Sequence, residues 1–286
     1  MKHRTHPLAV IPMHPGTMLG EDELEGIIGP YLEALASVGG ERAGLEKETG
    51  DHATFLLVTT GGSEGVIMDW WSRRQASAAD QPLWLIAHPG NNSLPAAIEV
   101  LARLQQDGVP GRIFYLRGPE DERGLEEVAE ATHGLAVKHW LEAARIGLVG
   151  TPSDWLVASM PKAETVKHKW GPTVVPVEMD EVVTRLQSAS DADIERHSDH
   201  LVSGADEVHE PSDREIRDVA GVYLALRDLV TEHELDALTV RCFDLVLNQK
   251  TTGCFALAQL TDDGVIAGCE GDLVSIIGLM WARQLL

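Results

Sequence analysis

Short apolar runs alternate with longer amphipathic stretches through the first half of the chain. The apolar runs predict strands at 8–13, 54–59, 83–88 and 112–116, and the stretches between them predict helices at 21–37, 64–76, 93–106 and 121–132. The runs are continuously apolar rather than alternating, which is typical of parallel strands covered on both faces. Strands and helices in alternation predict a doubly wound α/β domain.

The alternation resumes near residue 145. Here it predicts strands at 145–150 and 173–177, a helix at 180–187, a mobile or weakly helical acidic excursion at 188–212, and a helix at 213–231 with Ser212 as its N-cap. Strands at 238–243 and 265–269, a helix between them at 252–260 and a last helix from Leu273 follow. We therefore predict two Rossmann-like domains with mostly parallel sheets. The first would comprise residues 1–146 and the second residues 147–286.

The chain is strongly acidic, with 23 basic and 45 acidic residues and a net charge of −22. Such a surface repels phosphate backbones and anionic membranes, so we expect neither nucleic acid nor membrane as a partner. The apolar runs are shorter than the roughly 18 residues of a membrane span, and the first, Leu8–Met13, is shorter than a signal-peptide core. These features predict a cytoplasmic protein. The charge disfavours anionic substrates at long range, whereas neutral sugars or metal cations would not be repelled.

The chain contains three cysteines, Cys242, Cys254 and Cys269. An odd number in a chain with no other cysteine argues against a disulfide framework, and their spacing matches no zinc pattern. We expect the three cysteines to be small, buried, apolar residues on core strands and a helix, and a reactive thiol is the alternative.

Acidic residues follow the last two predicted strands. Asp244 comes after the first, and Glu270 and Asp272 come after the second. Carboxylates at the carboxyl ends of neighbouring parallel strands meet at one edge of the sheet and are suitable ligands for a divalent cation. The alternative for Asp272 is that it only caps the final helix. We predict a metal site at this edge.

Polar loops also follow three predicted strands of the first domain. They indicate a cleft in which a polyol is bound by hydrogen bonds, and the candidate residues are His14, Glu64, His88, Asn91 and Asn92. The alternative is a set of structural loops in which asparagine tolerates unusual backbone angles. The Gly61-Gly62 turn lacks the lysine and spacing of a nucleotide-binding loop, so it gives only weak support for phosphate binding.

The terminal segment resembles the metal-binding domain of the L-fucose isomerase family. The residues that carry the resemblance are RCFD (241–244), TGC (252–254) and CEGD (269–272), and the loops at 60–64 and 88–92 extend it to the first domain.

The resemblance implies a homo-oligomeric aldose–ketose isomerase that moves a proton through an enediol with the help of a divalent metal, usually Mn²⁺. Asp244 and Asp272 would hold the metal and act in catalysis, and Glu270 would be an alternative ligand. The family usually has glutamate where Asp244 stands. It also takes a third ligand, a histidine, from a C-terminal domain that this chain does not contain, so catalytic activity stays open. The alternative is a non-catalytic sugar-binding, metal-binding or assembly protein with the isomerase fold.

Overall fold

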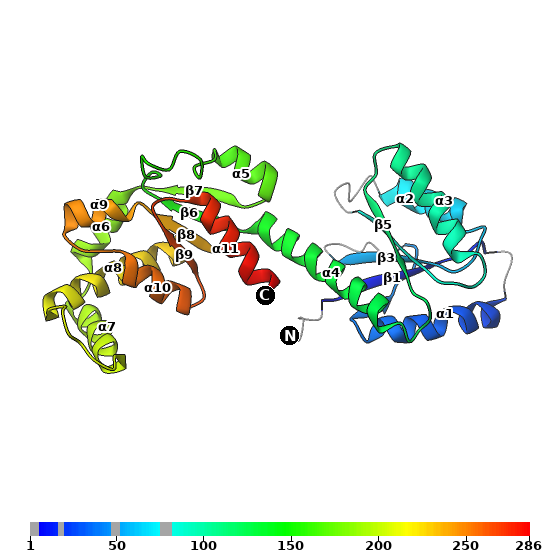
Figure 1. Ribbon diagram of the computed structural model, residues 1–286, viewed down its shortest axis with the longest axis horizontal. Helices are drawn as coiled ribbons and strands as arrows, with labels where there is room; N and C mark the ends of the chain where they lie inside the picture. Colours follow the sequence, from blue (N-terminus) through cyan, green and yellow to red (C-terminus); the bar gives the residue numbers. More distant parts are fainter. Residues whose placement is uncertain (1–5, 17–19, 47–51, 75–81) are drawn as a thin grey trace. The chain divides into compact units, whose positions relative to one another are not determined.

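The computed structural model describes residues 6–16, 20–46, 52–74 and 82–286 (Figure 1). The chain divides into two compact units, Met1–Ala136 and Val137–Leu286. The division falls within helix α4 (Glu122–Ala143), whereas the sequence placed it between residues 146 and 147, inside strand β6 (Arg145–Val149).

The described residues of the first unit form a parallel five-stranded sheet in the order β2-β1-β3-β4-β5. Its strands are β1 (Leu8–Met13), β2 (Gly40–Arg42), β3 (Ala53–Val58), β4 (Leu83–Ala87) and β5 (Gly111–Tyr115). Helices α1 (Glu21–Ala36) and α4 cover one face, and α2 (Glu64–Arg74) and α3 (Ser93–Gln106) cover the other. This is the predicted doubly wound arrangement.

Each face of the first sheet buries its own core. Phe55 on β3 contacts Trp84 at 4.8 Å and Phe114 at 5.2 Å between ring centroids, beneath α1 and α4. The opposite face packs the two tryptophans of α2, Trp70 and Trp71, against aliphatic residues of β3 and β4. Burial on both faces explains why these strands are apolar at successive positions.

The described residues of the second unit form a parallel four-stranded sheet in the order β7-β6-β8-β9. The remaining strands are β7 (Thr173–Val177), β8 (Ala237–Val240) and β9 (Ile266–Cys269). Helices α6 (Met179–Ser188), α8 (Asp213–Glu232) and α10 (Cys254–Asp262) cover one face. The other face is covered by α5 (Ala163–Trp170), α11 (Leu273–Leu285) and the end of α4. The α/β class with two mostly parallel sheets is thus confirmed.

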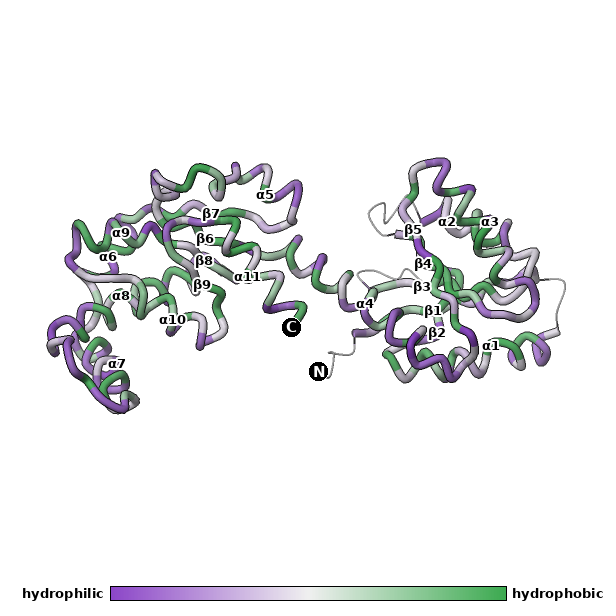
Figure 2. Tube along the Cα trace, viewed as in Figure 1, coloured by the Kyte–Doolittle hydropathy of each residue, from purple (hydrophilic) through white to green (hydrophobic). Residues whose placement is uncertain are grey.

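Two regions differ from their predicted form. Residues 191–204 form the helix α7 (Asp191–Gly204), which is largely hydrophilic in Figure 2 and packs on α8. Strand β8 ends at Val240, earlier than predicted, and the chain turns into the short helix α9 (Cys242–Asp244) and the π-helical turn η1 (Leu245–Gln249). The prediction that Ser212 caps α8 is confirmed, because its side chain and that of Glu215 form a capping box.

The strand order places a topological switch point in each sheet. In the second unit β7 lies on one side of β6, and β8 and β9 lie on the other, so the chain leaves β6 and β8 in opposite directions at the carboxyl edge. Ligands of open α/β sheets bind at such a point. In the described ranges, no helix is long and apolar enough to cross a membrane.

The turn from β9 to α11 requires a glycine. Gly271 has a φ of +73°, and a Cβ placed on it would lie 2.7 Å from the Cα of Pro152 and 3.0 Å from the carbonyl oxygen of Thr151. Both contacts are with backbone atoms, which cannot move aside as a flexible side chain would. Gly271 therefore lets the loop after β6 pack directly against the end of β9.

We expect Gly271→Ala to lower the free energy of unfolding by about 1–3 kcal/mol, because the left-handed backbone and the contact with Pro152 both resist a side chain. Urea denaturation measures the change. Gly278→Ala is the matched control, since this exposed glycine in α11 has open space around it; alanine there should stabilise the helix by about 0.5–1 kcal/mol. Equal stability of the two variants would contradict the packing described.

Candidate functional site at the carboxyl edge of the second sheet

Arg241 connects the loops at the switch point of the second sheet. It directly follows β8, and its backbone N–H extends the ladder to Val149 of β6 at 2.9 Å. Its guanidinium donates to the carbonyl oxygen of Pro152 at 2.7 Å and pairs with Asp154 at 3.1 Å and Asp244 at 3.1 Å. The two carboxylates raise the pKa of Arg241, first through the hydrogen bond with Asp154. Arg241 is therefore a permanent cation that fixes the loops after β6 and β8 to each other.

Glu270 follows β9 in a strained backbone conformation. Its φ is +67°, uncommon for a residue other than glycine. The backbone N–H of Ser153 donates to its carbonyl oxygen at 2.8 Å, and the indole N–H of Trp155 donates to Oε2 at 2.8 Å. Strained residues held by their neighbours are common at ligand sites. The loop after β6 thus holds both the backbone and the side chain of Glu270.

Asp272 caps helix α11. Its Oδ1 accepts from the backbone N–H of Ser275 at 2.8 Å, and its Oδ2 accepts from the Ser275 hydroxyl at 2.7 Å. The capping alternative given in the sequence analysis therefore describes what this carboxylate does in the structure. Its function as a metal ligand stays a prediction.

The three predicted metal ligands belong to the same edge but have different partners. Asp244 lies in α9 rather than at the strand end, and its Oδ1 is paired with Arg241. Glu270 is bound to Trp155, and Asp272 to Ser275. Among the residues that the structure describes, no three histidine, cysteine, aspartate or glutamate side chains form a group that could hold a metal ion.

Two exposed aromatic side chains, which were not predicted from the sequence, lie at this edge, and one of them, Trp155, donates a hydrogen bond to Glu270. Trp155 is 53% exposed and Phe243 is 44% exposed, and their rings meet edge to face at 5.0 Å. Trp155 belongs to the irregular segment between β6 and α5, and Phe243 belongs to α9. A tryptophan in a long loop at a strand end was the signal available in the sequence.

The cysteines are not core residues, and the prediction that they are buried was wrong. Cys254 and Cys269 are exposed and Cys242 is half-buried. Strand β8 ends before Cys242, so that strand position was misassigned. Cys269 is in a strand and Cys254 in a helix as predicted, but Cys269 is the last residue of the edge strand β9 and Cys254 is the first residue of α10. Partial burial, followed by the nearby Cys242 and Glu270, raises the pKa of the Cys269 thiol.

Among the candidates in the first unit, His88 is built into the loop structure. It is buried, its Nε2 lies 3.1 Å from the carbonyl oxygen of Thr59, and the N–H of Gly90 donates to its Nδ1 at 3.2 Å. A neutral ring with the proton on Nε2 satisfies both contacts. Burial lowers the pKa of His88, and the bond to Thr59 opposes this in part. The ring therefore stays neutral and supports the ends of β3 and β4.

Asn91 and Asn92 have φ values of 53° and 56°, the left-handed conformation that asparagine tolerates. The carbonyl oxygen of Asn91 accepts from the N–H of Gly61 at 2.7 Å, so the loops after β3 and β4 pack together. His14 is half-buried at the end of β1 and Glu64 opens α2; neither side chain makes a hydrogen bond or ion pair in the described part of the chain. Substrate binding by these residues stays a prediction.

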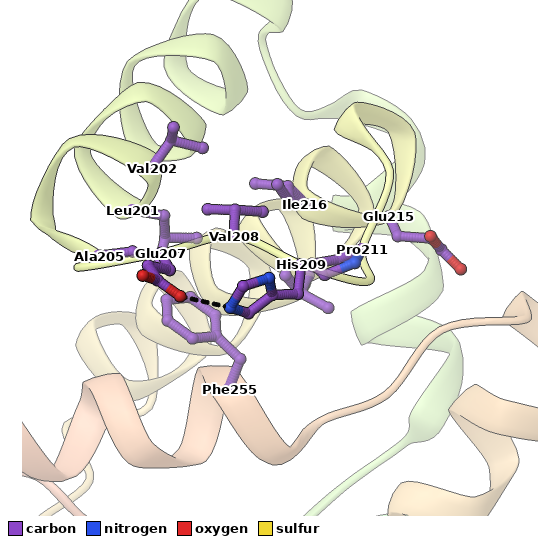
Figure 3. A pocket seen from close by; sticks show the side chains of 11 residues that line it. Leu201, Val202, Ala205, Glu207, Val208, His209, Pro211, Glu215, Ile216 and Phe255 are labelled. Carbon is purple, nitrogen blue, oxygen red and sulfur yellow. Dashed lines mark ion pairs between the residues drawn. The ribbon is translucent and has the colours of Figure 1, made fainter.

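An apolar pocket of about 320 Å³ lies between α7, α8 and the start of α10 (Figure 3). Its polar groups are occupied locally: His209 pairs with Glu207 at 2.6 Å, and Glu215 belongs to the capping box. The described residues that line it include none of the predicted site residues. We therefore place the candidate chemistry at the strand edge rather than in this pocket.

Sulfoquinovose isomerases are among the proteins to which the chain is similar. It is 24% identical over 177 residues to the sulfoquinovose isomerase of Priestia aryabhattai, a stretch that covers 60% of this chain and 39% of that protein. It is 24% identical over 200 residues to the sulfoquinovose isomerase of Clostridium sp. (strain MSTE9), covering 68% of this chain and 44% of that protein. No protein-family model matches the sequence.

The chain therefore spans less than half the length of the curated relatives it matches. Their names support the sugar isomerase class that the sequence analysis expected, whereas the more specific resemblance to L-fucose isomerases stays a prediction.

Because burial lowers the pKa of His88, we expect it to make the protein less stable in acid. Below the ordinary value of 6.5 the unfolded histidine binds a proton that the folded one does not, so the free energy of unfolding should fall as the pH falls through 6.5. His88→Gln should flatten this dependence. Urea denaturation at several pH values tests the prediction, and identical pH slopes in both proteins would contradict it.

We expect Cys269 to react slowly with iodoacetamide at neutral pH despite its exposure, because its raised pKa leaves little thiolate. The rate should reach half its maximum above the ordinary pKa of 9.0. Mass spectrometry of peptides from wild-type protein, alkylated across a pH series beside a free cysteine peptide, gives this midpoint. A midpoint below 9 would show that the environment favours the thiolate instead.

Proposed function

We propose that this chain binds a small sugar at the carboxyl edge of the second sheet and takes part in aldose–ketose isomerisation. The observation that carries the proposal is the similarity to sulfoquinovose isomerases over 177 to 200 residues. Two features of the structure support it. The carboxylates and aromatic residues gather at a topological switch point, and a strained glutamate lies among them.

The chemistry requires a proton to move between two adjacent carbons. A base removes the proton from C2 of the aldose, an enediol forms when the carbonyl oxygen gains a proton, and the proton is then returned to C1 while the C2 hydroxyl becomes the new carbonyl. No oxidant is consumed. A carboxylate near the sugar can carry the proton, and Asp244 and Glu270 each keep one oxygen outside their bonds to Arg241 and Trp155. The Arg241 cation would favour the charge that develops on the oxygens.

A divalent cation, with Mn²⁺ as the expected one, is part of this proposal. If bound, it would polarise the carbonyl and the neighbouring hydroxyl of the sugar. The free oxygens of Asp244 and Glu270 are its available ligands in this chain, and Asp272 would first have to release Ser275. The described residues alone do not complete a set of three donors, so the remaining ligands would come from the sugar, from water or from a partner subunit.

A neutral sugar is the substrate class we propose first. The net charge of −22 disfavours an anionic substrate at long range, and Arg241 already faces two carboxylates. The relatives, however, are named for a sulfonated sugar. Both kinds of sugar therefore belong in the test.

The second candidate function is binding of a sugar or metal without turnover. The observation that favours it is the use of both Asp272 oxygens in capping α11. This leaves a predicted catalytic carboxylate engaged in stabilising the fold.

To test the proposal, L-fucose, L-arabinose, glucose and sulfoquinovose are incubated with the protein and Mn²⁺, Mg²⁺ or EDTA, and the ketose is followed by NMR. We expect metal-dependent turnover of at least one sugar. Asp244→Asn and Glu270→Gln should each lower kcat by about 10²–10⁴, the usual contribution of an acid–base group. Glu164→Gln, an acidic residue in the first turn of α5, is the control and should be active.

Turnover that both site variants retain in full would place the chemistry elsewhere. Saturable binding of a sugar without turnover would favour the binding function. Neither turnover nor binding with any sugar would refute the proposal.

A further inference from the structure

We propose that Trp155 and Phe243 form the wall of the site against which the sugar packs, and that the indole N–H of Trp155 positions Glu270. This inference rests on the proposed function, because it assumes a sugar at the carboxyl edge of the second sheet. It adds a recognition surface and a positioning contact to the carboxylates that were predicted from the sequence.

Trp155 and Phe243 are unusually exposed for large aromatic side chains. Phenylalanine, tryptophan and tyrosine make up only 5% of the chain, and large aromatic side chains are usually buried. Trp155 and Phe243 are 53% and 44% exposed, yet their rings pack on each other at 5.0 Å with an interplanar angle of 85°. The contact orders both rings while leaving much of their surface uncovered. Ordered aromatic faces beside polar groups suit the C–H face of a sugar ring.

The aromatic residues and Glu270 come from three separate strand ends. Trp155 comes from the loop after β6, Phe243 from the turn after β8, and Glu270 from the end of β9. Three strand ends thus bring an apolar surface and a carboxylate together at the switch point, where α/β sheets bind ligands. Arg241 holds two of these segments in place through Pro152 and Asp154.

Both the backbone and the side chain of Glu270 are constrained by the loop after β6. Its backbone is held in the left-handed region, and Ser153 bonds its carbonyl oxygen. The bond from Trp155 to Oε2 then fixes the carboxylate and leaves Oε1 for a ligand. Orientation of an acid–base group in this way raises the fraction of encounters that can react.

The test compares two changes at one position. Trp155→Ala removes both the aromatic face and the N–H, whereas Trp155→Phe keeps an aromatic face and removes the N–H. We expect Trp155→Ala to raise KM about tenfold through lost ring contact. Trp155→Phe should keep KM near the wild-type value and lower kcat about tenfold through looser orientation of Glu270. Trp170→Ala, which changes an exposed tryptophan of α5, is the matched control and should alter neither constant.

A double-mutant cycle isolates the positioning contact. If Trp155 acts on kcat through Glu270, Trp155→Phe should have no further effect on kcat in a Glu270→Gln background. A readout without turnover is the indole N–H signal of Trp155 in ¹H–¹⁵N NMR spectra, assigned with Trp155→Phe. It should shift as the sugar that gives the strongest turnover or binding is added, and the Trp170 signal should not.

The outcomes distinguish a failure of the sugar-packing role of Trp155 and Phe243 from a failure of the proposed isomerase function. Wild-type turnover together with an unchanged KM in Trp155→Ala and an unshifted Trp155 signal would overturn this inference and leave the proposed function standing. If Trp155→Ala does not fold, Trp155→Phe and the NMR signal decide the matter. If the wild-type protein neither turns over nor binds any sugar, the proposed function fails and this inference fails with it.

Discussion

The arrangement of the second unit's candidate site depends on the charged network around Arg241. One guanidinium on a half-buried side chain bonds the backbone of Pro152 and two carboxylates from separate segments. Without it, Asp154 and Asp244 would repel each other in a chain that already carries a net charge of −22. The network also brings the loop after β6 to the end of β9, where Ser153 and Trp155 meet Glu270. A single cation thus compensates local repulsion and sets the positions of the surrounding groups.

Most of the fold could be predicted from hydrophobic patterning. Strand β1 and helix α3 have the predicted bounds, because continuous apolar runs and a regular amphipathic stretch leave few alternatives. Strand β2 (Gly40–Arg42) was missed because it is a short edge strand of polar residues. Helix α7 was predicted only as weak because its sequence is largely polar; its apolar residues gain stability by packing on α8, which local propensity does not report.

The site could be predicted only in outline. That acidic residues gather at the carboxyl edge of β8 and β9 follows from parallel strand pairing, and the structure shows those strands as neighbours. The hydrogen-bond partners of each carboxylate could not be foreseen, since Trp155 lies 115 residues before Glu270 in the chain. The exposed cysteines show the same limit. Cys254 and Cys269 lie in the predicted helix and strand, but their exposure depends on which faces of α10 and β9 are covered, and this is set by tertiary packing rather than by composition.

The order of pairing in the second sheet has a consequence for how the protein folds. The central strands β6 and β8 are neighbours, and the backbone N–H of Arg145 at the start of β6 bonds Asp236, 91 residues later. Closing so long a loop costs conformational entropy before the strand contacts can compensate for it. Sheets whose strands are distant in the sequence therefore form slowly. The loops after β6 and β8 can meet only once this closure has occurred. The candidate site should therefore be among the last parts of the unit to assemble, after the helices have formed.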